Sequence, residues 1–478
     1  MTDTATTVAE DGRADRSGQS AGPGLTLLAL ASAGLVVSLQ QTLVLPLLPQ
    51  LMQTFDISVA AVSWVFTATL LAGAVATPLL SRFGDMYGKK KMISVTMTLL
   101  VVGSAICAIA DSLALLIVGR ALQGTSAAVI PLAIGMIRDS YPRERVTTAI
   151  GVVSATLGVG GAAGMLVTGL IADNTDSHHP VFWIAAAMAA VGLLFVLFCT
   201  RDSGRRAGGR PDLVGAALLG GWLVSLLIGI SQGNAWGWTD ARILGLFAAA
   251  VVLCAVWVAV ELKIREPLVR LQILVGPKSL SANLASLLLG FSMFAAFTLI
   301  SNFIQTPESE VGYGLSGSVL DVGLYMLPST FSMLIFSALS GRIEARIGAA
   351  WTLSLGSLIA GVAYVWLALM HDSALDVMIF SGIQGLGIGI AYAALGTLAV
   401  QHVPMDQSGI ASGINSLVRT AGGSIASAAT AAVLAAQVID GTEVPTVDAY
   451  VLCFVIAGVA AGAAAAIAAS HGLRHGRK

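Results

Sequence analysis

The chain has 478 residues, of which 56% are hydrophobic and only 11% carry a charge, and its formal net charge is −1. Soluble domains carry about 25% charged residues, so this composition excludes an ordinary soluble protein. It indicates an integral membrane protein.

Fourteen apolar stretches, separated by short polar segments, follow one another along the chain. A helix that spans a bilayer needs about 20 apolar residues, and each stretch has roughly that length. They lie at residues 25–53, 59–80, 90–110, 113–137, 147–172, 180–199, 212–231, 243–262, 279–305, 316–340, 349–370, 374–400, 408–436 and 447–470. The sequence therefore predicts an all-α integral membrane protein with fourteen transmembrane helices.

The basic residues lie on one side of these predicted helices. All but three of the 25 Lys and Arg residues fall in the tails or in the loops that follow an even-numbered helix, the exceptions being Arg120, Arg242 and Arg419. Loops rich in Lys and Arg stay on the cytoplasmic side of a membrane. We therefore expect a multi-pass protein of the cell membrane with both termini in the cytoplasm.

The chain repeats itself at an interval of about 260 residues. The corresponding landmarks are Gly88 and Gly348, Gln123-Gly124 and Gln384-Gly385, and Pro142 and Pro404. This interval places helices 1–6 on helices 9–14 and leaves helices 7 and 8 without a counterpart. The halves share one orientation, so they are parallel repeats, and transporters built in this way bind their substrate between the halves near the midplane of the membrane.

The expected organisation is therefore six plus two plus six helices. It comprises a disordered cytoplasmic tail at 1–24, an N-terminal six-helix bundle at 25–199, a linker with the inserted helices 7 and 8 at 200–278, a C-terminal six-helix bundle at 279–470 and a cytoplasmic tail at 471–478. The first tail has no apolar stretch with which to build a core, so we expect it to be disordered.

Two polar motifs interrupt the apolar pattern of the first half. One is the segment 81–91, which reads Ser-Arg-Phe-Gly-Asp-Met-Tyr-Gly-Lys-Lys-Lys, and the other is Arg120-Ala-Leu-Gln-Gly in helix 4. Both resemble signatures of the major facilitator superfamily. The resemblance of the first rests on Asp85, Gly88, Lys90 and Lys91.

Two further segments resemble the fourteen-helix drug:proton antiporter branch of that superfamily, and the resemblance covers nearly all of residues 25–470. They are Leu39-Gln-Gln-Thr-Leu-Val-Leu-Pro in helix 1 and Ser231-Gln-Gly-Asn-Ala-Trp-Gly-Trp after helix 7. The resemblance implies a secondary transporter that exports amphipathic or cationic compounds against proton uptake, by rocking one half against the other. In this branch an Asp usually stands where Gln40 stands here, and a Gln cannot carry a proton.

The candidate cavity residues are polar or aromatic side chains at membrane depth. An Arg in the membrane costs about 2.5–3.5 kcal/mol even on insertion scales, so Arg120 should face the interior of the bundle. The candidates are Gln40, Gln41, Trp64, Arg120, Gln123, Asn302, Gln305, Tyr325, Asn415 and Arg419. For Gln40, Gln41 and Arg120 the alternative is a structural role, in which they bond only to neighbouring helices.

Asp321 is the one acid that we expect well inside a helix of the second half. An isolated carboxylate in an apolar setting takes up a proton readily, so Asp321 is the candidate proton carrier, with Arg120 as a second residue of proton coupling. The alternative is that Asp321 lies in the hydrated headgroup layer.

The position of Asp85 predicts a lock, that is, a set of polar contacts that holds the two halves together in one state of the transport cycle. It ends helix 2 and can accept hydrogen bonds from the first amides of helix 13, near Ser408, because a helix N-terminus favours an anion. It can also pair with Arg138. The predicted lock comprises Asp85, Gly88, Lys90, Lys91 and Arg138. In the second half Ala345 stands where Asp85 would be, so the lock is expected to be one-sided, and the alternative is a solvated loop whose lysines only keep it in the cytoplasm.

Other kinds of function find little support in the sequence. It contains no Gly-x-x-x-x-Gly-Lys-Ser/Thr phosphate loop and no nucleophile, His and acid grouping that would indicate an enzyme, and His178-His179 lacks a third metal ligand. We expect no metal and no cofactor. The expected partners of a monomer are a small-molecule substrate, protons and membrane lipids, without nucleic acid. Two other functions stay open: export of a lipid or an endogenous metabolite, with or without protons, and a non-transporting membrane receptor or scaffold.

Overall fold

The computed structural model of the chain describes residues 23–44, 47–57, 59–172, 175, 177–201, 212–264, 267, 271, 276–401, 403–404, 407–439 and 444–475. The tail predicted at 1–24 falls outside these residues except for its last two, which begin the first helix. Within the predicted linker, residues 202–211, 265–266, 268–270 and 272–275 also fall outside them.

The described chain is a series of helices without a strand. The first half contains α1 (Pro23–Thr42), α2 (Leu48–Phe55), α3 (Val59–Tyr87), α4 (Lys89–Ala108), α5 (Leu113–Gly124), the 3-10 segment η2 (Thr125–Ala128), α6 (Val129–Ser140), α7 (Arg143–Ala172) and α8 (His179–Cys199). The inserted pair is α9 (Leu213–Trp236) and α10 (Ala241–Glu261). The second half contains α12 (Pro277–Gln305), α13 (Glu308–Val311), α14 (Val319–Tyr325), α15 (Leu327–Ile347), α16 (Ala349–Leu369), α17 (Ala374–Gln401), α18 (Ser408–Ala436) and α19 (Val447–His475).

The predicted membrane-crossing helices are present. Within the described residues, 13 helical stretches are long and apolar enough to span a membrane, and Val214–Ile230 in α9 is a shorter apolar stretch. Helix 4 of the sequence corresponds to α5, η2 and α6 in succession, and helix 10 corresponds to α14 and α15. The prediction of an all-α membrane protein is confirmed.

Several predicted helix boundaries differ from the structure, most clearly in the first helix. The run predicted at 25–53 is divided, because α1 ends at Thr42 and α2 begins only at Leu48. Pro49 fits the start of α2 better than the interior of one long helix, because proline has no N–H to donate and is tolerated in the first helical turn. The last helix extends to His475, five residues beyond the predicted end.

The segment 81–91 is helical rather than an open loop. Helix α3 continues to Tyr87, and α4 begins at Lys89, so Gly88 is the single residue between them. Gly88 has a φ of 109°, and Gly348, between α15 and α16, has a φ of 83°. Such angles strongly favour glycine. The two glycines of the repeat therefore make the same sharp connection between consecutive helices.

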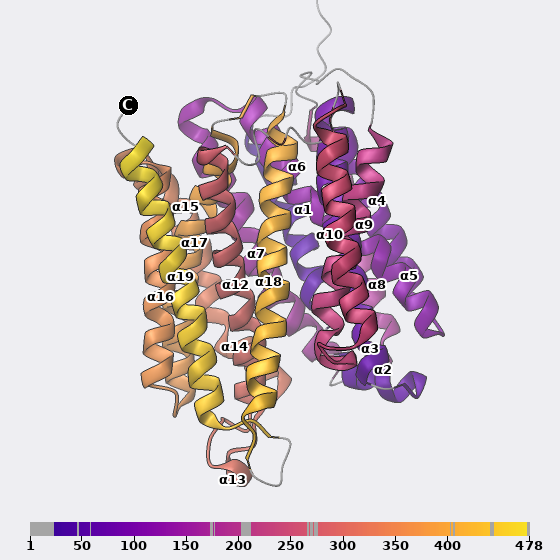
Figure 1. The fold of residues 1–478 in the computed structure, drawn as a ribbon, viewed down its shortest axis with the longest axis vertical. Coiled ribbons are helices and arrows are strands. Elements are labelled where there is room, and N and C mark those ends of the chain that lie inside the picture. The colour runs from indigo at the N-terminus through magenta and orange to yellow at the C-terminus, as the bar shows by residue number, and fades with distance from the viewer. Residues whose placement is uncertain are drawn as a thin grey trace, which may run out of the picture.

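The two halves lie side by side with their long helices roughly parallel (Figure 1). Both described chain ends lie at the same end of the bundle, at the top of the view, whereas α2 and α13 lie at the other. We call the first the basic end, because Gly88 and the lysines after it lie there. The six-plus-two-plus-six arrangement of parallel halves predicted from the repeat agrees with this layout.

Helix α7 packs against both halves. The glycines that the sequence places along it fall on two faces. A Cβ added at Gly164 would lie 2.6 Å from the carbonyl oxygen of Leu39 in α1. On the other face, Ser337 of α15 donates a hydrogen bond to the carbonyl of Gly151 (2.6 Å). Small residues allow this close approach of helices in a membrane, so α7 is one contact surface between the halves.

The inserted pair covers the other seam between the halves. Leu219, Leu223 and Leu227 of α9 belong to one apolar cluster with Ala74 of α3 and Leu417 of α18. Helix α10 packs on α9, and only 17% of its most apolar stretch is buried inside the protein. Helix α9 therefore packs against α3 of the first half and α18 of the second.

Candidate functional site

A cavity lined by both polar and apolar side chains lies at the boundary between the halves. Its walls come from α1, α3, α5 and η2 of the first half and from α12 and α18 of the second. Gln40, Gln41, Thr69, Leu70, Gly73, Ala74, Thr77, Gln123, Gly124, Ser126, Ala127, Phe294, Leu417 and Thr420 line it. Its volume is about 50 Å³, whereas pockets for drug-sized ligands measure about 300–1,000 Å³. The halves must therefore move apart before a compound of that size can enter.

Arg120 lies directly behind the cavity wall, and its side chain is fully buried. Its Nε donates to the carbonyl of Val65 in α3 (3.2 Å), and its Nη1 donates to the carbonyl of Gln40 in α1 (3.2 Å) and to Oε1 of Gln123 (2.7 Å). The guanidinium thus joins three helices. This is the structural role considered for Arg120, and it also holds two glutamines at the cavity wall.

Ser104 of α4 completes this polar network. Its Oγ accepts hydrogen bonds from Nε2 of Gln40 (3.0 Å) and Nε2 of Gln123 (2.9 Å), and it donates to the carbonyl of Leu100 (2.8 Å). Within the part of the chain that the structure describes, Nη2 of Arg120 and Oε1 of Gln40 have no hydrogen-bond partner. The network therefore retains one free donor group and one free acceptor.

Glycines determine how closely these helices approach. A Cβ at Gly103 of α4 would lie 2.6 Å from the carbonyl oxygen of Gly119 in α5, and a Cβ at Gly124 would collide with the carbonyl oxygen of Thr69 in α3. Such contacts are shorter than van der Waals packing permits. A glycine beside Gln123 is therefore required by packing. Gly124 lets α5 approach α3 closely enough for the Gln123 side chain to reach the cavity.

Four other candidate residues, Trp64, Asn302, Gln305 and Tyr325, are not among the described residues that line this cavity. Trp64 is half-buried, and Asn302 and Gln305 are exposed near the end of α12 opposite the basic end. Gln305 donates to the carbonyl of Ser301 in its own helix (2.9 Å). Tyr325 is half-buried at the end of α14, and its carbonyl accepts from Ser381 of α17 (2.8 Å).

Asn415 and Arg419 join helices of the second half. Asn415 donates through Nδ2 to Oδ1 of Asn283 in α12 (3.2 Å). The guanidinium carbon of Arg419 lies 4.4 Å from the ring centre of Tyr392 in α17, and its Nη2 donates to Oγ of Ser416 (3.2 Å). Both are placed beside the cavity-lining face of α18 rather than on it.

Asp321 occupies the first turn of α14. It forms a capping box with Ser318, in which its Oδ2 accepts from the Ser318 backbone N–H (2.7 Å) and hydroxyl (2.8 Å) while its own N–H donates to Ser318 Oγ (3.2 Å). This corrects the expectation of an isolated acid inside a helix. The predicted helix began at 316, but α14 begins only at Val319, so Asp321 lies at its start.

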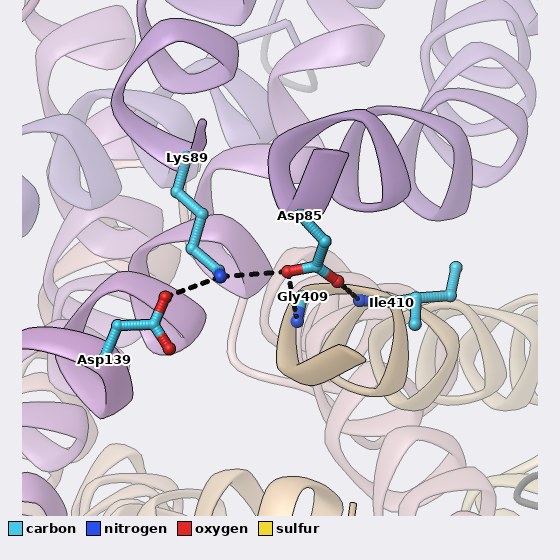
Figure 2. A network of polar contacts seen from close by, with 5 residues as sticks. All are labelled: Asp85, Lys89, Asp139, Gly409 and Ile410. Carbon is cyan, nitrogen blue, oxygen red and sulfur yellow. Dashed lines mark hydrogen bonds and ion pairs between the residues drawn. The ribbon is translucent and has the colours of Figure 1, made fainter. Parts of the chain in front are cut away.

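Asp85 lies at the basic end, where the halves meet. Its Oδ1 accepts from the backbone N–H of Gly409 (3.1 Å) and its Oδ2 from that of Ile410 (3.0 Å), both in the first turn of α18 (Figure 2). The side chain is 1% exposed. The contact expected between this acid and the helix amides is therefore present, and it joins the first half to the second.

Lys89 is the cation beside Asp85. Its Nζ lies 2.9 Å from Oδ1 of Asp85 and 2.7 Å from Oδ2 of Asp139 at the end of α6 (Figure 2). The expectation that this lysine is solvated is wrong, because it is only 2% exposed. A buried carboxylate needs a counter-charge, and Lys89 supplies it to Asp85.

The other expected lock residues have different roles. Arg138 does not contact Asp85; its Nη2 donates to the carbonyl of Val403, before α18 (2.7 Å). It therefore makes a separate contact between the halves. Lys90 donates to the carbonyls of Leu197 (2.8 Å) and Thr200 (2.6 Å) at the end of α8, within the first half, and Lys91 is exposed.

Glu344 provides a second carboxylate contact between the halves. Its Oε1 accepts from the hydroxyl of Thr147 in the second turn of α7 (3.1 Å). The expectation of a one-sided lock, based on Ala345, is therefore wrong. The acid of the second half stands one residue earlier than strict repetition predicts, and the break at Gly348 still follows it.

We expect replacement of Thr147 by Val to loosen this second contact. A typical hydrogen bond contributes about 0.5–1.5 kcal/mol, so Thr147→Val and Glu344→Ala should each increase opening at the basic end by up to about tenfold. The double variant should open no further than either single variant, because both remove the same bond. Labelling rates of an engineered cavity cysteine measure opening, and Arg346→Ala, an exposed neighbour, is the control. Additive effects would contradict a shared bond.

Two parallel sets of membrane-crossing helices with a cavity between them are the arrangement found in many secondary transporters. A sequence model of the Major Facilitator Superfamily matches residues 30–427. The chain therefore belongs to this superfamily.

Several curated relatives are similar over most of their length. The chain is 29% identical over 433 residues to the tetracenomycin C resistance and export protein of Streptomyces glaucescens, which covers 89% of this chain and 78% of that protein. It is 27% identical over 420 residues to the multidrug resistance protein Stp of Mycobacterium tuberculosis (86% and 76%). It is 26% identical over 416 residues to the lincomycin resistance protein of Streptomyces lincolnensis (86% and 84%).

A solved structure has the same fold. The human organic anion transporter MFSD10 superposes with a TM-score of 0.62 over 95% of this chain and 99% of its own, at 14% sequence identity. At that identity the likeness shows the fold alone.

Sequence reasoning missed several residues of the site. Thr69, Thr77 and Ser126 line the cavity with hydroxyl groups, and Phe294 and Leu417 add apolar surface. Thr and Ser at membrane depth are common, so only their place opposite the other half distinguishes them. Glu344 had a readable signal, since it stands four residues before Gly348 as Asp85 stands three before Gly88.

Proposed function

We propose that this protein exports amphipathic small molecules by alternating access between its two halves. The single observation that carries the proposal is the cavity at their boundary, whose lining from both halves combines polar and apolar side chains. The relatives named for resistance to, or export of, tetracenomycin C, lincomycin and multiple drugs support drug-like substrates. The proposal further includes that proton entry drives the export.

The orientation is part of the same proposal. The positive-inside rule favours a cytoplasmic basic end in a cell membrane, with both termini inside. The contacts of Asp85, Arg138 and Glu344 then close the cytoplasmic side. Transport requires these contacts to break, so that the cavity opens toward the cytoplasm and enlarges to admit its substrate.

Export is tested by flux through the purified protein in proteoliposomes. Tetracenomycin C and lincomycin are suitable first compounds, and transport is measured with and without an imposed pH gradient. Protein-dependent flux that increases with the gradient is expected. If neither compound, nor any of a wider panel of drugs, is transported, drug export is rejected. If transport does not depend on the pH gradient, only the proton coupling is rejected.

A second candidate is export of an endogenous metabolite without proton coupling. It is favoured by Gln40, which stands where the branch usually has an acid, and by the absence of any acid among the described cavity-lining residues. Flux that persists after the pH gradient is collapsed by an ionophore supports this candidate.

A further inference from the structure

In the spans that the structure describes, the charges at membrane depth are all positive. Among the charged residues of the described spans, Arg120 and Arg419 alone lie more than six residues from an end of their span. The acids lie near span ends, such as Asp85 at the basic end and Asp376 at the opposite one. The layer that contains the cavity therefore holds two cations and, among the described residues, no anion.

The partners of Arg120 do not cancel its charge. It bonds to the carbonyls of Val65 and Gln40 and to the neutral amide of Gln123, and the described residues place no carboxylate within ion-pair distance of it. A guanidinium stays protonated in proteins. A buried charge is costly unless it is paired, so Arg120 retains a strong preference for an anion.

Position 40 explains why this charge is uncompensated. The backbone of Gln40 touches the Arg120 guanidinium, and its side chain lines the cavity. An acid at this position would lie beside the cation and neutralise it. With a glutamine there, the positive potential reaches the cavity across a single layer of side chains, where the low dielectric leaves it weakly screened.

We infer that this cavity selects compounds that carry an anionic or strongly hydrogen-bond-accepting group, such as a carboxylate or an ionised phenol, and rejects permanent cations. The inference rests on the proposed export function and names its substrate class. It revises the expectation of cationic substrates. Arg120 lies behind the wall, so its positive charge acts on such a group across Gln40 and Gln123. Phe294 and Leu417, which line the cavity, then contact the apolar body of the compound.

The test compares two probe ions of nearly equal size and shape and opposite charge, tetraphenylborate and tetraphenylphosphonium. Their binding to the purified protein in detergent is measured by titration calorimetry at constant ionic strength. Protein-free micelles give the blank for partitioning into detergent. We expect tetraphenylborate to bind at least tenfold more tightly, which corresponds to about 1.4 kcal/mol.

Two variants place a carboxylate beside Arg120 from different helices, Gln40→Asp from α1 and Gln123→Glu from α5. Each should lower the preference for the borate at least tenfold. Should one variant fail to fold, the other makes the same change of charge. Gln437→Glu is the matched control, since it adds the same charge at an exposed residue beyond the end of α18, and it should leave the preference unchanged.

Each result has a defined meaning. Equal binding of the two ions, or tighter binding of the phosphonium, overturns the inference while leaving export intact. An unchanged preference in both carboxylate variants overturns the assignment to Arg120. Binding of neither ion also overturns the inference, and export is then judged from the flux assay alone.

Discussion

Replacing Asp85 by Ala should open the basic end of the transporter by about 100-fold. The variant loses two hydrogen bonds from the α18 amides to a buried carboxylate, and bonds to charged groups contribute about 1.5–3 kcal/mol each. It also leaves Lys89 with one carboxylate partner instead of two. Two such bonds together contribute about 3–6 kcal/mol, and a 100-fold change corresponds to about 2.8 kcal/mol, which is slightly below that sum.

The opening is measured by labelling a cysteine in the cavity with a membrane-impermeant maleimide applied to the basic side. Thr77→Cys is suitable, because Thr77 lines the cavity. The 4 native cysteines are first replaced. Gly409→Ala should have the same effect, since its Cβ would lie 2.7 Å from Oδ1 of Asp85, whereas the exposed Lys91 gives the control Lys91→Ala. Unchanged labelling in both test variants would contradict a lock at Asp85.

Replacing Arg120 by Ala should abolish transport and destabilise the first half. The change removes the donor to Val65, Gln40 and Gln123 at once. The carbonyl of Val65 keeps a hydrogen bond from the Thr69 hydroxyl (3.3 Å), whereas Oε1 of Gln123 and the carbonyl of Gln40 lose the guanidinium donor. A buried acceptor that loses its partner costs about 1–3 kcal/mol, so we expect a loss of at least about 2 kcal/mol. The measurements are thermal unfolding of the purified protein and flux in proteoliposomes.

Arg120→Lys separates charge from geometry. A lysine keeps the positive charge but lacks the planar fork that reaches three acceptors on three helices. It should recover part of the preference for an anionic probe but little of the lost stability. Full stability in Arg120→Lys would show that the fork geometry is dispensable, and normal transport in Arg120→Ala would remove this residue from the site.

The contact between Asp85 and α18 could be predicted because it joins two local signals. A charged break between apolar runs places an acid at a helix end, and a helix N-terminus attracts an anion wherever the chain places one. The partner cation could not be chosen in the same way. Lys89, Lys90 and Lys91 are equivalent in the sequence, and only the close approach of α6 at Gly135, whose added Cβ would lie 2.7 Å from Cε of Lys89, buries the first of them.

Asp321 shows the opposite case, in which a local signal was present and was outweighed. Ser318-Val-Leu-Asp321 matches a helix-capping pattern with an acid at the third helical position, and the structure contains that capping box. The apolar run around it favoured an interior position instead. Whether Asp321 caps a helix or lies inside one depends on the residue at which the helix starts, and hydropathy does not locate that residue.

The sequence by itself determined the fourteen apolar helices, the separation of basic residues to one end and the duplication around an inserted pair. These properties depend on composition and order along the chain, which the bilayer sorts by length and charge. Only the tertiary structure decided that Arg120 lies behind Gln40 and Gln123 with no acid of the described residues within ion-pair distance, and that Glu344 bonds to Thr147. These contacts depend on how each helix is rotated about its axis and on how closely the helices approach at glycines. Neither property can be derived from a local sequence pattern.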